Sequence, residues 1–320
     1  MESKKAYITF LSRPLGQATD NDPYVLYTIA LWHSWKLTNS KYDFYVIMTD
    51  TLTPKSVEMM HNLGIKTIIV TTNEFDDLVK GSKVQKNWIE ALKKLAIFKL
   101  YDFEHLVFLD CDTYMTQNMD HIFEYPTLTC TGRYSCDPSK GITNILSGML
   151  GFKPNKEDYD NLMNVVSKVV NREYEEDNMQ PEKTNDEHIL NKAFEGRMYG
   201  LHCGYQYMPH VFNRHDIPWS DVYLVHSGAP KSKWFTKERF INNVGLKMPY
   251  SEYDYAMIYW YFHKLDEVVK LYNLPYEILK ESSDIDMSKI PLKLPKEKPI
   301  KTKSEKPVYQ KPEDDLVDLW

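Results

Sequence analysis

Short apolar runs alternate with segments of helical periodicity along the first third of the chain. Four runs rich in β-branched and aromatic side chains predict strands at residues 6–11, 44–48, 66–70 and 106–109. Apolar positions three and four residues apart predict helices over residues 24–37, 54–63 and 88–101. Nearly continuous apolar strands separated by helices are typical of a parallel sheet covered on both faces. We therefore expect an α/β fold with a mainly parallel central sheet and helices on both faces.

The alternation continues less regularly in the second half. Strands are expected at residues 144–152 and 222–225, and helices at residues 155–170, 184–194 and 254–272. Thr184 and Glu187 have the spacing of a capping box, which would begin the helix at 184–194. The aromatic run at residues 257–262 is expected to pack in the core, with a platform for a sugar ring as the alternative.

The character of the chain changes after about residue 281. Residues 289–312 hold eight Lys, two Glu and five Pro, and residues 313–320 are acidic and apolar and end in Trp320. Such a segment buries too little apolar surface to fold. We therefore divide the chain into one domain at residues 1–275 and a flexible tail at 281–320. The composition favours a solvated tail, and the alternative is a docking motif for a protein partner.

Composition excludes several classes of protein. The net charge of -6 over 320 residues argues against a nucleic-acid binder, since phosphate neutralisation needs a basic surface. The four cysteines form no CxxC pair, so a zinc site and a disulfide scaffold are not expected. The sequence shows neither a signal peptide nor an apolar run long enough to span a bilayer, which predicts a reduced, cytoplasmic protein. Dinucleotide, P-loop and hydrolase-elbow motifs are absent from the sequence.

The strongest chemical feature is the pair of carboxylates that follows the apolar run at 106–109. Strand periodicity places Asp110 and Asp112 towards one side and Cys111 towards the other. Ligands bind at the carboxyl ends of the strands in open α/β sheets. Two hard oxygen ligands at that edge predict half of a Mg²⁺ or Mn²⁺ site shared with substrate phosphates, and a solvated turn is the alternative.

Two enzyme classes use a DxD sequence after an apolar strand. Haloacid-dehalogenase-like phosphatases carry it near the start of the fold, whereas nucleotide-sugar glycosyltransferases carry it after about a hundred residues. Tyr114 stands where the phosphatase pattern has Thr or Val, and the sequence lacks a Gly-Asp dipeptide. The position of Asp110 and Asp112 therefore favours the glycosyltransferases, with the phosphatase as the alternative.

Several motifs occur in the order found in one glycosyltransferase family. They are residues 6–10, residues 21–26, Lys94, Asp110-Cys111-Asp112, Ser147-Gly148, residues 186–191, and His226-Ser227-Gly228 with Lys231, Lys233 and Trp234. From residue 6 to about residue 240 the sequence resembles the retaining family 8 glycosyltransferases, the group of glycogenin and galactinol synthase. The resemblance implies a GT-A type fold and a metal-dependent, retaining transfer of a hexose from a UDP-sugar to a hydroxyl acceptor. Family frequency suggests UDP-glucose as the donor, then UDP-galactose.

The resemblance also implies roles for individual residues. Mn²⁺ or Mg²⁺ would be held by Asp110, Asp112 and His226, and Asp186 and Lys94 would be the catalytic residues. The implied donor-binding residues are Thr9, Asn21, Tyr24, Lys94, Asp110, Ser147, Gly148, Glu187, Gly228, Lys231 and Lys233. The partners are then a UDP-sugar and a sugar or protein hydroxyl, with a homodimer left open and neither nucleic acid nor a membrane span expected.

Two departures from the family pattern bear on the sugar. Leu146 replaces the Asn of Asn-Ser-Gly, and Glu187 replaces a Gln. A further alternative is therefore a catalytically weakened sugar-binding or scaffold protein with the same fold. Non-functional alternatives also remain: Lys94 as a solvated helix lysine, and His226 as a structural histidine.

Overall fold

A seven-stranded sheet forms the centre of the molecule. The computed structural model describes residues 4–14, 16–84, 86–133, 137–140, 142, 144–208, 217–227 and 252–276. The strands are β1 (Lys5–Leu11), β2 (Asp43–Met48), β3 (Lys66–Ile69), β4 (His105–Leu109), β6 (Thr129–Gly132), β7 (Ile145–Phe152) and β8 (Tyr199–Leu201). Their order is β3-β2-β1-β4-β7-β6-β8, and β7 alone among these strands runs against the others. The mainly parallel sheet matches the sequence prediction.

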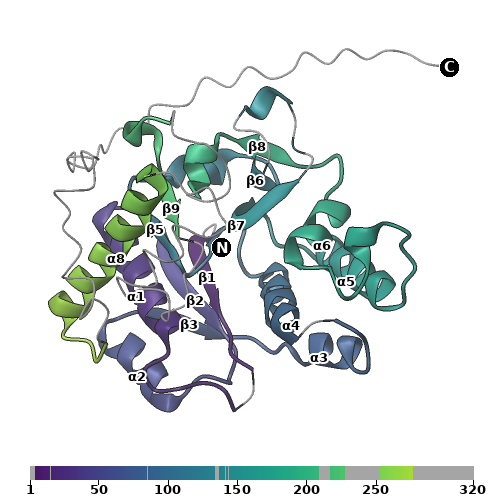
Figure 1. The fold of residues 1–320 in the computed structure, drawn as a ribbon, viewed down its shortest axis with the longest axis horizontal. Coiled ribbons are helices and arrows are strands. Elements are labelled where there is room, and N and C mark those ends of the chain that lie inside the picture. The colour runs from purple at the N-terminus through teal and green to yellow at the C-terminus, as the bar shows by residue number, and fades with distance from the viewer. Residues whose placement is uncertain are drawn as a thin grey trace.

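Helices cover both faces of this sheet (Figure 1). One face carries α1 (Pro23–Leu37), α2 (Pro54–Asn62) and α8 (Glu252–Tyr272), and the other carries α3 (Asn73–Val79), α4 (Lys86–Lys93), α5 (Lys156–Val170) and α6 (Asp186–Ala193). Alternate residues of β1 divide between the two layers: Tyr7 and Leu11 pack with α1, whereas Ile8 and Phe10 pack on the opposite side. This period of two follows from strand geometry and explains why the apolar runs are nearly continuous.

A second, two-stranded sheet lies beside the first. β5 (Thr113–Met115) pairs antiparallel with β9 (Leu224–His226), and Thr113 stands opposite His226. The strand predicted at 222–225 is therefore present, shifted towards His226. This pairing brings together two segments more than a hundred residues apart in the sequence, and both adjoin predicted site residues.

Two helix predictions need correction. The helix expected at 88–101 is α4 followed by the 3₁₀ helix η1 (Lys94–Lys99), so the geometry changes at Lys94. The capping box at α6 is formed by Asn185 and His188, not by Thr184 and Glu187. The Thr184 hydroxyl instead donates to the carbonyls of preceding residues, which removes it from the capping position.

The aromatic run of α8 packs in the core where the structure describes its side chains. Trp260, Tyr261 and Phe262 are buried. Trp260 meets Tyr114 edge to face with ring centroids 5.3 Å apart. Core packing is thus confirmed for these three residues, and the side chains at 257–259 lie outside the described residues, as does the predicted tail at 281–320.

Other features of the described chain bear on the remaining expectations. Within those residues, every helix is too short or too polar to cross a membrane. Cys111 and Cys130 carry free, buried thiols. Cys203 is disulfide-bonded, which differs from the reduced chain that the cysteine count predicts.

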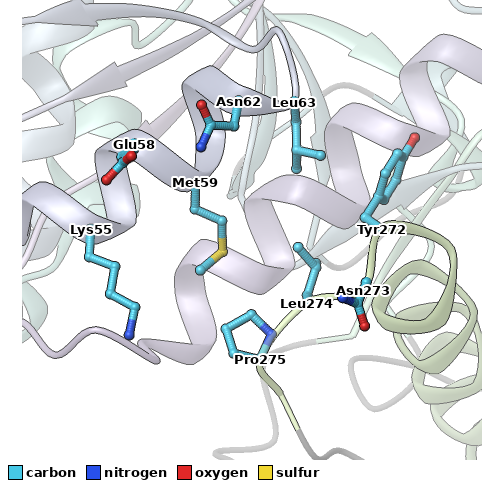
Figure 2. A pocket seen from close by; sticks show the side chains of 9 residues that line it. All are labelled: Lys55, Glu58, Met59, Asn62, Leu63, Tyr272, Asn273, Leu274 and Pro275. Atoms are coloured by element: carbon cyan, nitrogen blue, oxygen red, sulfur yellow. The ribbon is translucent and has the colours of Figure 1, made fainter.

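A surface groove separates α2 from the end of α8 (Figure 2). Its lining is mixed apolar and polar and consists of Lys55, Glu58, Met59, Asn62, Leu63, Tyr272, Asn273, Leu274 and Pro275. The Tyr272 hydroxyl hydrogen-bonds His33 Nδ1 of α1 at 2.9 Å, which ties α8 to the neighbouring helix. The groove contains none of the residues that the sequence singles out for chemistry.

Candidate active site

The two carboxylates of the DxD sequence lie in a turn between β4 and β5. The Asp110 backbone N–H donates to the Gly148 carbonyl at 2.9 Å, which extends the pairing of β4 with β7. The Thr113 N–H and hydroxyl both donate to the Asp110 carbonyl and close the turn. The sequence predicts that the strand ends at these carboxylates, and strand periodicity is used to place both on one side. The turn still directs Asp110 and Asp112 to a common point, because both reach the same histidine.

That histidine is His226, the last residue of β9. His226 Nε2 lies 3.2 Å from Asp112 Oδ1 and 3.9 Å from Asp110 Oδ2. One ligand atom from each residue falls within 4.8 Å of the others. Asp112 and His226 are only 8% and 6% exposed, whereas Asp110 is partly exposed and leaves the group open on its side. Two carboxylate oxygens and one imidazole nitrogen form a donor set that suits Mn²⁺ and Mg²⁺.

The electrostatics of this cluster reflect crowded charges out of water. Burial disfavours the charged forms of all three groups and raises the pKa of Asp110. For Asp112, the effect of burial is outweighed by His226, which lowers the pKa of the carboxyl. The pKa of His226 is raised, because the charge of Asp112 outweighs its burial. Asp112 and His226 thus favour each other's charged forms, whereas burial works against the charge of Asp110.

Lys94 is a buried cation beside this cluster. It is 8% exposed, and its Nζ lies 2.6 Å from Asp186 Oδ2 and 3.3 Å from Asp110 Oδ1. It also donates to Ser147 Oγ at 3.1 Å. Burial opposes its charge, but the two carboxylates outweigh burial and raise the pKa of Lys94. The structure disagrees with the alternative of a solvated helix lysine.

Asp186 is the first residue of α6, where the helix dipole stabilises negative charge. Its Oδ2 accepts a hydrogen bond from Ser147 Oγ at 2.6 Å. Burial raises its pKa, but Lys94 and Ser147 outweigh that effect, so the pKa of Asp186 is lowered. Asp186, Ser147 and Lys94 are therefore joined to the DxD turn as one network.

Glu187 extends the network to a residue that the sequence did not single out. Its Oε1 accepts from the Ser147 N–H at 3.4 Å, and its Oε2 pairs with the Arg133 guanidinium. Burial raises the pKa of Glu187, and Asp186 adds to this shift while Arg133 opposes it. Arg133 directly follows β6, 54 residues before Glu187 in the chain. The sequence offered one signal for Arg133, namely Glu187, because a partly buried carboxylate needs a positively charged partner.

Gly148 leaves the space that the imidazole needs. A Cβ at this position would come within 2.6 Å of both His226 Nδ1 and Gln206 Nε2, closer than real Cβ contacts. Gln206 itself lies 3.0 Å from His226 Nδ1 and is a second residue that sequence analysis missed. Gly148 therefore contributes to the site by having no side chain, which leaves room for His226 and Gln206.

Tyr24 lies next to the DxD turn in this structure. Asp22 caps α1 by accepting from the Tyr24 N–H at 3.0 Å, and the Arg13 guanidinium lies 5.0 Å from the Tyr24 ring centroid. Burial, with the nearby Cys111 and Asp112, raises the pKa of Tyr24 to about 12. The Tyr24 hydroxyl is therefore neutral, its backbone N–H is held by the cap, and its ring lies beside the Arg13 cation.

The remaining predicted residues are less closely connected. Thr9 is fully buried within β1, and Asn21 is exposed just before α1. Gly228, Lys231 and Lys233 lie outside the described residues, so their donor-binding roles stay predictions.

The chain is similar in sequence and in fold to known proteins. No protein-family model matches the chain. The chain is 30% identical over 132 residues to glucose N-acetyltransferase 1-B of Kluyveromyces lactis, covering 39% of this chain and 27% of that protein. It is 28% identical over 127 residues to putative UDP-glucuronate:xylan alpha-glucuronosyltransferase 4 of Arabidopsis thaliana, covering 40% and 21%. The chain thus spans about a quarter of the length of these relatives.

A solved structure extends the likeness to most of the fold. Galactosyltransferase LgtC in complex with donor and acceptor sugar analogs matches with a TM-score of 0.51 at 14% identity, covering 79% of this chain and 99% of that one. The predicted likeness to the family 8 glycosyltransferases is confirmed. The GT-A type fold, as expected from the sequence, is shared with that glycosyltransferase.

Proposed function

We propose that this protein is a metal-dependent retaining glycosyltransferase that moves a hexose from a UDP-sugar to a hydroxyl acceptor. The carrying observation is the cluster of Asp110, Asp112 and His226, in which Asp112 and His226 are buried, joined to Asp186 through Lys94. A cation site alone fits many enzymes. A cation site with an acid-lysine pair beside it, in the fold of a sugar transferase, supports transfer from a nucleotide sugar.

The donor set fits Mn²⁺ or Mg²⁺, with Asp110, Asp112 and His226 as its ligands. Bound there, the cation would offset the charge that develops on the leaving diphosphate. Lys94 holds Asp186 in a fixed ionised state, because its ammonium contacts that carboxylate directly. Asp186 is thereby prepared to accept hydrogen bonds from the hydroxyls of the donor sugar. Arg133 pairs with Glu187 and so offsets the negative charge that Glu187 would add beside Asp186.

The UDP-sugars to be tested as donors are chosen from family frequency and from the names of the relatives. UDP-glucose is our first choice and UDP-galactose the second. UDP-glucuronate joins them because the Arabidopsis relative carries that donor in its name. The acceptor is a sugar or a protein hydroxyl.

Release of UDP tests the proposal without knowledge of the acceptor, since transferases of this type hydrolyse donors slowly. The full chain is incubated with each UDP-sugar and Mn²⁺, with and without a chelator. We expect chelator-sensitive release of UDP from one donor, and its loss in Asp112→Asn. Asp160→Asn is the matched control, because the exposed Asp160 of α5 contacts only a surface lysine among the described residues. Equal rates in wild type and Asp112→Asn would contradict the proposal.

The same assay separates the two alternatives. A phosphatase would release inorganic phosphate from a phosphomonoester and leave UDP-sugars intact. A weakened sugar-binding or scaffold protein would bind UDP in the presence of Mn²⁺ without turnover of any donor.

A further inference from the structure

Gln206 makes a buried link between His226 and β6. It ends the 3₁₀ helix η5 (Cys203–Gln206) and is 1% exposed. Its Nε2 lies 3.0 Å from His226 Nδ1, and its Oε1 lies 3.3 Å from the Thr131 hydroxyl. Because His226 Nε2 lies 3.2 Å from Asp112 Oδ1, a continuous row of polar contacts runs from Thr131 through Gln206 to the DxD turn.

The orientation of the Gln206 amide and the tautomer of His226 depend on each other. As the atoms lie, the Gln206 amide N–H donates to Nδ1, so the neutral imidazole carries its proton on Nε2, facing Asp112. A cation held by His226 needs the lone pair of Nε2, which moves the proton to Nδ1. An Nδ1–H then requires an acceptor in a place closed to water.

An amide supplies both partners from one position. Its oxygen and nitrogen are nearly equal in size, so a half-turn of the Gln206 amide replaces the donor to Nδ1 by an acceptor of similar volume. The Thr131 hydroxyl is also both a donor and an acceptor, so it can follow the reversal. Leu could do neither, and a carboxylate could only accept.

We infer that Gln206 is a positioning residue that turns its amide with the tautomer of His226, donating to Nδ1 without the cation and accepting from it when the cation binds. This inference rests on the proposed cation site and adds the group that orients its histidine. Partners of this kind hold metal-binding imidazoles in one orientation and are worth about 10- to 100-fold in metal affinity.

Mn²⁺ binding by the full chain tests the inference directly, with free Mn²⁺ read from its electron paramagnetic resonance signal. Gln206→Leu should weaken binding about 10- to 100-fold. Gln206→Glu should stay close to wild type, because a carboxylate accepts from Nδ1–H. Thr131→Val should weaken binding less than Gln206→Leu does. Thr129→Val is the matched control on the same strand, since its hydroxyl donates to the Pro126 carbonyl, away from this row.

The outcomes are separable. Wild-type affinity in Gln206→Leu, or equal losses in Gln206→Leu and Gln206→Glu, would overturn the inference. If circular dichroism shows that Gln206→Leu is unfolded, Thr131→Val decides, and a loss no greater than that of Thr129→Val overturns it. Absence of Mn²⁺ binding by the wild type would overturn the cation site itself, and the inference with it.

Nitrogen-15 spectra of the histidine side chains test the reversal itself, with diamagnetic Mg²⁺ as the cation and His226→Asn for assignment. We expect the wild type to carry Nε2–H without Mg²⁺ and Nδ1–H with it. Gln206→Glu should carry Nδ1–H in both states. A wild-type His226 with the same tautomer in both states would overturn the reversal.

Discussion

Lys94 Nζ lies 2.6 Å from Asp186 Oδ2 and joins the 3₁₀ helix η1 to the first turn of α6. The same ammonium reaches Asp110 at 3.3 Å, so one cation serves carboxylates from two segments. Lys94 and Asp186 are both buried, and away from water a charge left without its counterion is costly. The pair therefore bears on stability as well as on the chemistry of the site.

Removal of Lys94 should destabilise the protein strongly. Lys94→Met leaves Asp186 without its cation, and breaking a buried pair in this way costs about 3–5 kcal/mol in the free energy of unfolding. The double variant Lys94→Met with Asp186→Asn should regain part of that loss. Urea unfolding measures both. Lys156→Met, which removes an exposed lysine, should change the free energy by less than about 0.5 kcal/mol. Equal stability of Lys94→Met and the control would count against the pair.

Gly148→Ala should impair cation binding more than folding. The new Cβ would lie 2.6 Å from both His226 Nδ1 and Gln206 Nε2, so the imidazole cannot keep its present position beside Gln206 and Asp112. We expect Mn²⁺ affinity to fall by at least about tenfold, as for loss of a group that orients a ligand. Gly151→Ala in the same strand is the control, because its Cβ would meet Ile122 and Thr129 instead. Titration calorimetry with Mn²⁺ compares the two variants, and equal affinities would refute the prediction.

The Arg133–Glu187 pair should behave as a unit. Arg133→Gln alone leaves Glu187 charged beside Asp186, whereas the double variant with Glu187→Gln removes both charges. A double-mutant cycle followed by urea unfolding should give a coupling energy of about 1 kcal/mol, since the groups touch but are partly exposed. The corresponding cycle on the exposed pair Arg172–Glu182 should give a coupling near zero. Similar couplings in the two cycles would argue against a special role for the first.

Acid should weaken the fold through His105 of β4. Burial, with the charges of Lys153 and Lys5, lowers the pKa of His105 to about 4 in the folded protein. An unfolded histidine has a pKa near 6.5, so the unfolded chain binds more protons between these values and stability falls as pH decreases from about 6.5 to 4. His105→Phe should lose less stability over this range than wild type, measured by urea midpoints.

The control for acid sensitivity is the exposed His61 of α2, which hydrogen-bonds Thr67 at the surface. His61→Gln should retain the wild-type dependence on pH. A dependence in His105→Phe as steep as that of wild type would assign the acid sensitivity to other groups.

The sequence predicts the long buried elements because their patterns are local. Apolar positions alone are enough to predict the strands at 6–11 and 144–152 and the helix at 155–170. β5, β6 and β8 were not predicted, since each has only three or four residues and is defined by its partner strand. At α6, two adjacent residues could cap, and the contacts of Thr184 with earlier carbonyls leave that place to Asn185.

The candidate site shows the same division. Asp110 and Asp112 follow an apolar strand, so their chemistry can be inferred from position alone. His226 needed a family resemblance, because only the pairing of β5 with β9 brings it to the DxD turn. Arg133 and Gln206 carried no pattern at all, since each is defined by a side chain distant in the sequence.

The short ladder between β5 and β9 fixes His226 opposite Thr113 through only three residue pairs. In any strand, a slip of one residue turns each side chain to the other face. An insertion or deletion within β9 would therefore rotate His226 away from Asp112 while leaving the seven-stranded sheet intact. Length variation in this protein's relatives should for that reason be tolerated before or after β9 but not inside it.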